Sequence, residues 1–407
     1  MGSASTRKNA CELEIDLFCR GMRLDDGGGP AEARASSRTR AGLGSGVELV
    51  ITGAHKDIWA NVPVVEPFAA SSPYRLVRDG GGHAIVDDRD GSRHPVRLAG
   101  TPRWYARATS RGTPMPRVGV MQGTYLAVYI GAVCDFWTMD PPQRCRFCTT
   151  GLNVGAVEEP VKDVADVVET ARAAKDECGI TFVHFNSGFH LDAGVEIAAP
   201  YVRAIKRDVG AMVGVQLAPD KDLARYDELI RLGVEHFSFC YELHDPAAFA
   251  RCLPGKQEHL GQKAFFDAIE YTSRRLGRGR VSGEIIAGIE PLAETKRAID
   301  YITGLGAFPT ICIFRPLAGA DMAADAPPAY EEMHELFAYA VEALRRNDVP
   351  IGLAPNLEVS LVVLPTDAME LAPDTWAFRK YRLKLAAMKA LARPYFAWRM
   401  RRHDPAR

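Results

Sequence analysis

The sequence feature that most restricts the fold is a regular alternation of apolar runs and helical segments between residues 118 and 325. Six apolar runs have the length and composition of buried strands, at residues 123–132, 180–185, 211–217, 235–241, 281–289 and 309–314. Segments with helical periodicity separate them, at residues 161–175, 197–209, 220–232, 262–276 and 294–305. This alternation requires parallel strands joined by right-handed helical crossovers. We therefore expect an α/β fold, a partial (β/α)6 TIM-type barrel, with reactive residues at the C-terminal ends of its strands.

Each side of this barrel region carries an addition, so we expect three domains. In residues 1–117 we expect a small N-terminal β-rich unit, with strand-like runs at residues 47–52, 83–86 and 96–99. About the first 40 residues are expected to be partly disordered. Residues 118–325 predict the barrel. Residues 326–407 predict a C-terminal α/β extension that contains a helix, a strand-like segment and a basic, aromatic helix, at residues 328–345, 357–364 and 373–401.

Charge and cysteine content exclude several classes of protein. The chain has 50 basic and 51 acidic residues and no apolar run long enough to span a membrane, so we expect neither a nucleic-acid nor a membrane partner. The N-terminus lacks the apolar core of a secretory signal, and the nine cysteines argue against a secreted disulfide framework, so we expect a cytoplasmic protein. The basic segment 373–401 fits either membrane-surface binding or packing on its own domain, and we favour packing.

Three cysteines lie on a loop directly after the first predicted barrel strand. Ten residues, among them Pro141 and Pro142, separate Cys134 from Cys145, and two residues separate Cys145 from Cys148. Thiolates are the soft ligands of iron–sulfur clusters, and three of them hold three irons and leave a fourth iron open. A structural zinc site usually has four protein ligands, and three unligated thiols are the remaining alternative. We favour the cluster.

This loop resembles that of the radical S-adenosylmethionine (SAM) superfamily. Residues 145–148 (CRFC) match the second half of the family pattern CxxxCxΦC, in which Φ is aromatic, whereas the first interval has ten residues instead of three. The resemblance extends over residues 118–320 and implies an oxygen-sensitive enzyme with a [4Fe–4S] cluster on Cys134, Cys145 and Cys148. The implied reaction is reductive cleavage of SAM to a 5′-deoxyadenosyl radical that abstracts hydrogen from a substrate, with flavodoxin or ferredoxin as the electron donor.

The resemblance also implies a SAM site at the strand ends. Asn186, Ser187 and Gly188 follow the second predicted strand, where the family binds the SAM amino group through backbone carbonyls. Glu242 follows the fourth strand, at a position that contacts the SAM ribose or amino group. Arg251, on the next segment, is placed to pair with the SAM carboxylate.

Two further residues complete the implied SAM site. Gly288 lies in the fifth predicted strand, which resembles the family strand beside the adenine, and Pro316 lies in the loop after the sixth strand. The residues also have ordinary explanations, because Asn-Ser-Gly is a common turn sequence and Glu242 with Arg251 fits a surface ion pair.

Three residues near predicted strand ends are candidates for catalysis. Cys240 and Tyr241 suit a radical relay or proton transfer, and Arg315 suits a clamp on a substrate carboxylate. Packing inside the barrel is the alternative for Cys240, and anchoring a loop is the alternative for Arg315.

The whole chain also resembles an uncharacterised group of radical SAM proteins associated with bacterial nitrilase gene clusters, through residues 145–153, 354–359 and 361–365. This resemblance implies a small, nitrogen-containing and amino-acid-like substrate. Two alternatives remain open. One is a radical SAM enzyme that modifies a peptide, and the other is a zinc-stabilised β/α-barrel hydrolase or binding protein.

Overall fold

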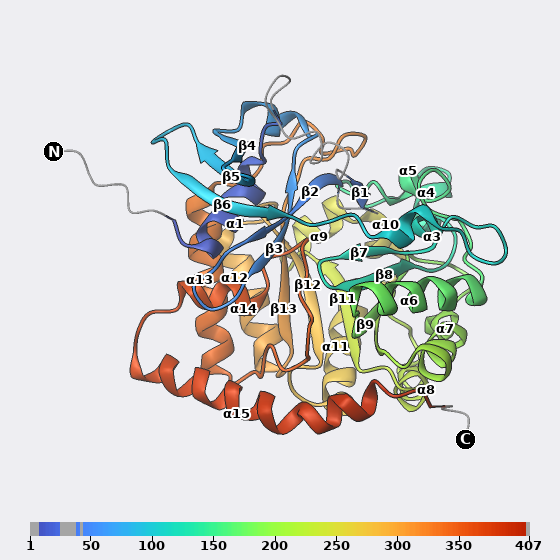
Figure 1. Ribbon diagram of the computed structural model, residues 1–407. Coiled ribbons are helices and arrows are strands. Elements are labelled where there is room, and N and C mark those ends of the chain that lie inside the picture. Colours follow the sequence, from blue (N-terminus) through green and yellow to red (C-terminus); the bar gives the residue numbers. More distant parts are fainter. Residues whose placement is uncertain (1–7, 25–37, 41–43, 404–407) are drawn as a thin grey trace.

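The structure is a computed structural model, and it describes residues 8–24, 38–40 and 44–403. Its elements form two sheets that belong to adjoining parts of the molecule (Figure 1). The N-terminal part contains an antiparallel sheet of six strands, and the other part contains a curled sheet of seven strands with helices on its outer face. The predicted fold class, a partial (β/α)6 barrel with a small β-rich unit, is confirmed.

The N-terminal part consists of one helix and an antiparallel sheet. Its elements are α1 (Ala10–Arg20), β1 (Arg38–Arg40), β2 (Gly44–Ile51), β3 (Ile58–Pro63), β4 (Tyr74–Asp79), β5 (Gly82–Asp87) and β6 (Arg93–Leu98). The strand order is β1-β2-β6-β5-β4, with β3 paired to β2. The three predicted strand-like runs therefore correspond to β2, β5 and β6.

Helix α1 is an ordered segment within the first 40 residues, for which the sequence predicted partial disorder. The helix begins after Asn9, whose side chain accepts a hydrogen bond from the backbone N–H of Glu12 at 2.9 Å. The Glu12 carboxylate in turn accepts from the backbone N–H of Asn9 at 2.7 Å, which completes a capping box. Residues 1–7 and 25–37, to which the same expectation applies, lie outside the described residues.

A buried carboxylate joins α1 to the N-terminal sheet. Asp16 accepts hydrogen bonds from the Tyr74 hydroxyl and from Nε of Arg20, both at 2.6 Å, and pairs with Arg89 at 3.0 Å. A charged residue on the inner face of a helix weakens the apolar periodicity of its sequence. This explains why the sequence pattern did not predict α1.

The curled sheet has six parallel strands and one antiparallel edge strand. Its elements are β7 (Val120–Gln122), β8 (Tyr125–Tyr129), β9 (Phe182–Asn186), β10 (Met212–Gln216), β11 (His236–Glu242), β12 (Val281–Ala287) and β13 (Phe308–Ile313). They are ordered β7 to β13 along the sheet, and each neighbouring pair from β8 to β13 is parallel. All six predicted barrel strands are confirmed.

Helices cover the outer face of this sheet (Figure 1). The crossovers contain α6 (Val164–Cys178), α7 (Ala199–Ala204), α8 (Arg225–Leu232), α9 (Pro246–Cys252), α10 (Pro254–His259), α11 (Gln262–Leu276) and α12 (Leu292–Gly304). Short helices α3 (Met115–Val118), α4 (Asp135–Thr138) and α5 (Thr150–Asn153) flank the first strands. The aromatic rings of Phe237 and Phe239 on β11 pack against Tyr226 of α8, so this side of β11 is apolar core.

The C-terminal region adds α13 (Tyr330–Arg346), α14 (Pro365–Ala368) and α15 (Trp376–Arg399). The predicted strand at 357–364 is wrong, because only Val363 makes a β-bridge, to Ile311 of β13. The carbonyl of Glu358 instead accepts from Thr124 N of the β7–β8 hairpin at 3.1 Å. The segment therefore crosses between the two edges of the curled sheet and closes its open side.

A buried ion cluster attaches α15 to the end of the sheet at which the parallel strands begin. Glu235 accepts from Nε of Arg399 at 2.6 Å, from Lys206 Nζ and from the backbone N–H of Val213 at 2.7 Å. Burial lowers the pKa of Lys206 to about 8, although Glu235 acts in the opposite direction. Two cations, Lys206 and Arg399, therefore pair with the one carboxylate of Glu235.

We expect Glu235→Ala to destabilise the protein strongly, because it leaves Lys206 and Arg399 buried without a carboxylate. Removal of one partner from a buried ion pair typically costs about 3–5 kcal/mol. Urea unfolding followed by circular dichroism measures the loss. Glu228→Ala, at a carboxylate exposed on α8, is the matched control, and equal unfolding midpoints for the two variants would contradict the assignment.

Candidate active site

A cavity of about 620 Å³ fills the inside of the curled sheet. At the C-terminal ends of the strands it is lined by Cys134, Cys145 and Cys148, and at the other end by Met388 and Tyr395 of α15. Its volume is in the range of small-molecule and cofactor sites. The cavity therefore joins the predicted cysteine loop to the lumen of the barrel.

The first half of the cysteine loop is fastened to the turn after β9. The backbone N–H of Asp135 donates to the carbonyl of Phe189 at 2.9 Å, and the Asp135 carboxylate accepts from Leu191 N at 2.7 Å. The Phe136 and Phe189 rings stack with centroids 4.5 Å apart. This half of the loop is thus held by backbone and ring contacts to one neighbouring loop.

The second half of the loop is held by segments that follow β11 and β13. Arg146 N donates to the carbonyl of Cys252 at 3.0 Å, and Gly255 N donates to the carbonyl of Gln143 at 3.1 Å. Met322 N donates to the carbonyl of Arg146 at 3.1 Å. Residues distant in sequence therefore fix residues 145–148 over the mouth of the cavity.

Gly188 lies directly against the first residue of the cysteine loop. A Cβ at this position would lie 2.3 Å from Cβ of Cys134 and 2.9 Å from Oη of Tyr129, so no side chain fits. The next residue, Phe189, donates its backbone N–H to Sγ of Cys134 at 3.3 Å. The structure thus gives Gly188 a specific steric role beside the first cysteine.

The three thiols are free to act as ligands. Cys134, Cys145 and Cys148 are half-buried and free of disulfides. Among the residues that the structure describes, no three His, Cys, Asp or Glu side chains are grouped closely enough to hold one metal ion. An iron–sulfur cluster spreads its ligands around a larger body, and backbone N–H groups donate to its sulfurs. Two backbone N–H groups already donate to the thiols here, that of Phe189 to Sγ of Cys134 and that of Thr150 to Sγ of Cys148 at 3.4 Å.

A buried ion pair lies beside the cysteine loop. Nζ of Lys256 is 2.5 Å and 2.7 Å from the two carboxylate oxygens of Glu242 and 2.6 Å from the carbonyl of Cys240. Burial raises the pKa of Glu242 to about 7, while Lys256 opposes this shift. Burial also disfavours the charge of Lys256, but Glu242 raises the pKa of this amine above its ordinary value. Glu242 has φ of 58° and lies at a bulge in β11, where its side chain meets Lys256.

The structure brings together eight of the residues predicted for the site. The cavity is lined by Cys134, Cys145, Cys148, Asn186, Ser187, Gly188, Cys240 and Glu242. They come from the ends of β8, β9 and β11 and from the cysteine loop. This convergence agrees with the rule that reactive groups lie at the C-terminal ends of barrel strands.

Three predicted SAM-site residues do not line this cavity. Arg251, predicted to pair with the SAM carboxylate, is exposed in the last turn of α9. Glu242 pairs with Lys256, so the alternative of an ion pair between Glu242 and Arg251 is wrong. Gly288 lies against Pro328, and Pro316 is buried beyond the end of β13. These positions give no support to the roles predicted for them.

Two predicted catalytic residues also lie outside the cavity. The Tyr241 ring packs edge-on against Phe266 of α11, because neighbouring residues of a strand point to opposite faces. Arg315 donates to the carbonyl of Asn61 at 3.0 Å and lies over the Phe18 ring, so it joins the barrel to the N-terminal part. Arg315 is therefore an anchor in this structure.

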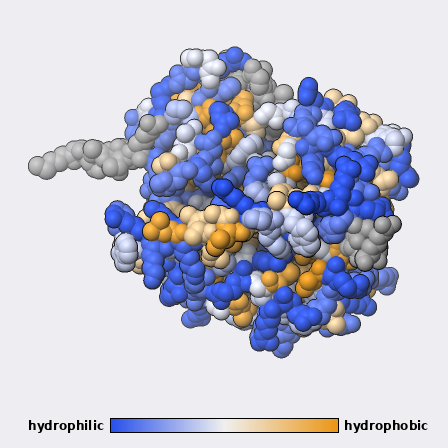
Figure 2. Space-filling view, turned by 60° about the horizontal axis from the view of Figure 1, so that its bottom comes forward, coloured by the Kyte–Doolittle hydropathy of each residue, from blue (hydrophilic) through white to orange (hydrophobic). Residues whose placement is uncertain are grey.

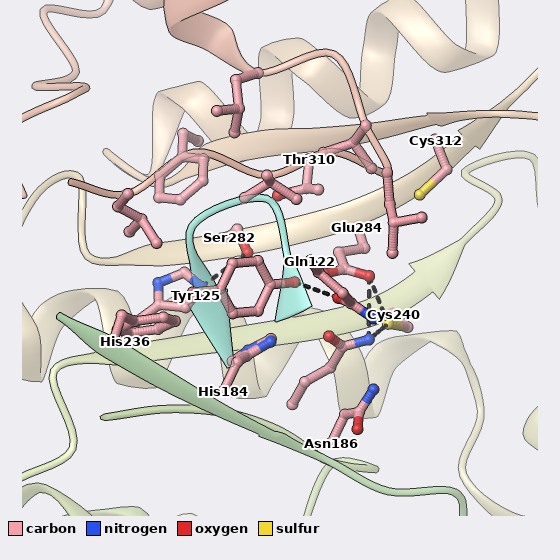
Figure 3. Close-up of a pocket in the computed structure, with 18 of the residues that line it drawn as sticks. Gln122, Tyr125, His184, Asn186, His236, Cys240, Ser282, Glu284, Thr310 and Cys312 are labelled. Carbon is pink, nitrogen blue, oxygen red and sulfur yellow. Dashed lines mark hydrogen bonds between the residues drawn. The ribbon is translucent and has the colours of Figure 1, made fainter. Parts of the chain in front are cut away.

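The sequence analysis missed a polar network inside the lumen. The Glu284 carboxylate accepts from the Cys240 thiol at 2.9 Å (Figure 3). It also accepts from the Ser238 hydroxyl at 2.7 Å and from the Gln216 amide at 3.1 Å. Burial raises the pKa of Glu284. The sequence contained a signal for this network, because polar residues occur at every second position of otherwise apolar strands. This spacing places them on one face of the sheet, here the lumen side.

Two histidines line the other half of the lumen (Figure 3). The His184 and His236 rings lie 5.9 Å apart, and burial lowers their pKa values to about 3 and about 4. Both imidazoles are therefore neutral at pH 7. Nε2 of His184 and Oδ1 of Asn186 are buried and have no hydrogen-bond partner among the described residues. These atoms are free to bind a polar group of a ligand.

Comparison with known proteins gives relatives that are enzymes. No protein-family model matches the chain. The chain is 25% identical over 282 residues to bacteriochlorophyllide c C-7(1)-hydroxylase of Chlorobaculum limnaeum, covering 61% of this chain and 68% of the hydroxylase.

Two solved structures are also similar. A radical SAM methyltransferase from Sphaerobacter thermophilus is 15% identical, with 68% of this chain and 76% of that chain covered and a TM-score of 0.41. Methylornithine synthase is 12% identical, with 70% and 90% covered and a TM-score of 0.41.

We expect Gly188→Ala to displace Cys134 and to lower the iron content of the anaerobically reconstituted protein to well under half. The added Cβ has no space, so one of the two loops must move. Gly304→Ala, where no atom lies within 4 Å of the added Cβ, is the matched control. Full iron content in the Gly188 variant would show that this contact does not position the cysteine.

Proposed function

We propose that this protein is a radical SAM enzyme in which Cys134, Cys145 and Cys148 hold a [4Fe–4S] cluster. The observation that carries the proposal is the convergence of these cysteines, the turn at residues 186–188 and the Glu242–Lys256 pair around one end of a barrel lumen. A soft sulfur site beside a pair of opposite charges suits a cluster and a zwitterionic cofactor.

A zinc-stabilised barrel is the weaker alternative. It requires about four ligands around one ion, and the described residues contain no such group. A peptide-modifying enzyme stays possible as a subclass of the same chemistry. The enclosed lumen favours a small molecule over a peptide, because α15 lines one end of it and residues 350–366 line its side.

When bound, the cluster supplies the electron that cleaves SAM to a 5′-deoxyadenosyl radical. The protein's own residues bind and orient the cofactor. We assign the turn at residues 186–188 to the SAM amino group, Glu242 to the cationic or ribose part, and Lys256 to the carboxylate. Lys256 takes the role that the sequence predicted for Arg251. The apolar walls exclude water and protect a reactive radical.

For the substrate, we propose a largely apolar small molecule that carries a nitrogen or oxygen hydrogen-bonding group. The rings of Phe182, Phe308 and Tyr125 line the lumen, while the free atoms of His184 and Asn186 offer polar contacts. The hydroxylase relative, whose name records reaction at a carbon of bacteriochlorophyllide c, supports a carbon as the target. The nitrogen-containing, amino-acid-like metabolite expected from the sequence meets this description when its side chain is apolar.

Cys240 is the predicted catalytic residue that supports this scheme. Burial raises the pKa of its thiol well above the ordinary value, and the neighbouring Glu284 carboxylate acts in the same direction. Cys240 therefore stays protonated and donates to Glu284. We propose that its thiol gives a hydrogen atom to a carbon-centred substrate radical. The thiyl radical that this leaves on Cys240 would be reduced to the thiol by one electron from the external donor and one proton.

The proposed function is tested by anaerobic reconstitution with iron and sulfide. We expect about four irons per chain and formation of 5′-deoxyadenosine from SAM and a reductant. Replacement of Cys134, Cys145 or Cys148 by Ala should abolish the product. Cys178→Ala, outside the cavity at the end of α6, should have no effect. One zinc per chain and no product from SAM would overturn the proposal.

We further expect Lys256→Met to weaken SAM binding. Loss of a charge-assisted hydrogen bond costs about 1.5–3 kcal/mol, or roughly tenfold to hundredfold in affinity. Isothermal titration of the reconstituted protein with SAM measures this change. Arg251→Met removes an exposed cation from the same crossover and should bind SAM normally. The reverse pattern would restore Arg251 as the SAM-binding residue.

A further inference from the structure

The C-terminal helix α15 is long and lies mostly on the surface. It has 24 residues, and only Phe378 and Tyr381 are fully buried. It lies across the end of the barrel opposite the cysteine loop (Figure 1). A helix of this length would span about 36 Å. The sequence led us to favour packing on its own domain, and this exposure requires another explanation.

Two apolar faces lie on opposite sides of α15. Successive residues turn by about 100° around a helix axis. Phe378, Leu385 and Phe396 therefore share one side, which packs on the barrel. Trp376, Leu383, Leu391 and Trp398, spaced by seven or eight residues, share the other side.

The outer apolar face is exposed to solvent. The exposed fractions of Trp376, Leu383, Leu391 and Trp398 are 74%, 67%, 81% and 57%. Of the ten exposed large hydrophobic side chains among the described residues, five are on α15. Figure 2 brings this end of the molecule forward and shows patches of apolar residues among hydrophilic ones. Concentrated exposure of this kind marks an interaction surface.

Basic residues are distributed around α15. The segment 376–402 contains nine Lys and Arg residues and no Asp or Glu, whereas the whole chain is balanced. Lys380, Lys389 and Arg393 make no hydrogen bond or ion pair with any residue that the structure describes. Arg379, Lys384 and Arg399 are paired with carboxylates, so the positive charge available to a partner is that of the remaining basic residues of the segment.

We propose that α15 docks the protein onto a membrane surface that contains anionic lipids. Helices that lie in a bilayer interface have an apolar face with Trp and Leu and a polar face rich in Lys and Arg. Trp376 and Trp398 stand at the two ends of the exposed face, and Trp is favoured at the level of the lipid headgroups. None of the helices that the structure describes could cross a bilayer, so this contact is peripheral.

A second copy of the chain is a poorer occupant of the same face. A symmetric dimer through α15 would place two cationic segments, each without a carboxylate, against each other. Anionic headgroups complement the charge instead. The inner face of α15 lines the barrel cavity through Met388, Ala392 and Phe396. Docking would therefore bring the lumen within one helix of the bilayer, where apolar molecules dissolve.

Vesicle sedimentation with the full-length protein tests the proposal. We expect binding to vesicles of phosphatidylcholine with 30% phosphatidylglycerol to be at least about tenfold stronger than binding to pure phosphatidylcholine, and to weaken in high salt. The variant Trp376→Ser, Leu383→Ser, Leu391→Ser, Trp398→Ser should bind at least about tenfold more weakly. The variant Lys380→Gln, Lys389→Gln, Arg393→Gln should lose the preference for anionic vesicles.

Matched controls change equivalent residues elsewhere. Val65→Ser, Val161→Ser, Leu191→Ser removes exposed apolar side chains away from α15, and Lys221→Gln, Arg231→Gln, Lys263→Gln removes exposed cations. Both should bind vesicles normally. Absence of binding to anionic vesicles, unchanged binding by the α15 variants, or a dimer that only the apolar α15 variant dissociates would overturn the proposal. Formation of 5′-deoxyadenosine is a separate readout, so failure of one proposal leaves the other intact.

Discussion

The candidate site depends on how closely two strand-end loops approach each other. The backbone of Gly188 lies against Cys134 with no space for a side chain, and Asp135 donates its backbone N–H to Phe189. Because β8 and β9 are parallel neighbours, the loops that follow them leave the sheet at the same edge. The cysteine loop, the turn at residues 186–188 and the Glu242–Lys256 pair meet there because the sheet is parallel and curled.

The lumen below this edge combines apolar walls with a few buried polar groups. The Glu284 carboxylate accepts three hydrogen bonds, whereas Nε2 of His184 has no hydrogen-bond partner among the described residues. Paired groups give a rigid wall, and an unpaired buried atom is costly unless a ligand satisfies it. The same lumen reaches α15, whose other face is apolar and exposed. The proposed chemistry and the proposed membrane contact thus lie at opposite ends of one cavity.

The sequence predicted the barrel well because buried strands and amphipathic helices have distinct periods. The three cysteines that the spacing singled out line one cavity, and their role as cluster ligands stays a prediction. The sequence did not single out Lys256, because its pairing with Glu242 depends on the turn at Leu253, where α9 ends and α10 begins. Cys240 lines the cavity and Tyr241 does not. Because side chains alternate between the two faces of a strand, the sequence could have shown that only one of these neighbours faces the lumen. The segment 357–364 has strand-like composition. It does not form a strand, because it contacts the β7–β8 hairpin at one edge of the curled sheet and β13 at the other.

The central claim is that three cysteines hold a cluster with an iron that is open to SAM. Electron paramagnetic resonance of the reconstituted, dithionite-reduced protein tests it most directly, with spectra recorded before and after addition of SAM. We predict a [4Fe–4S] signal whose shape changes when SAM binds, because the open iron gains ligands. A cluster signal that saturating SAM leaves unchanged, or a protein that holds no iron, would contradict the account.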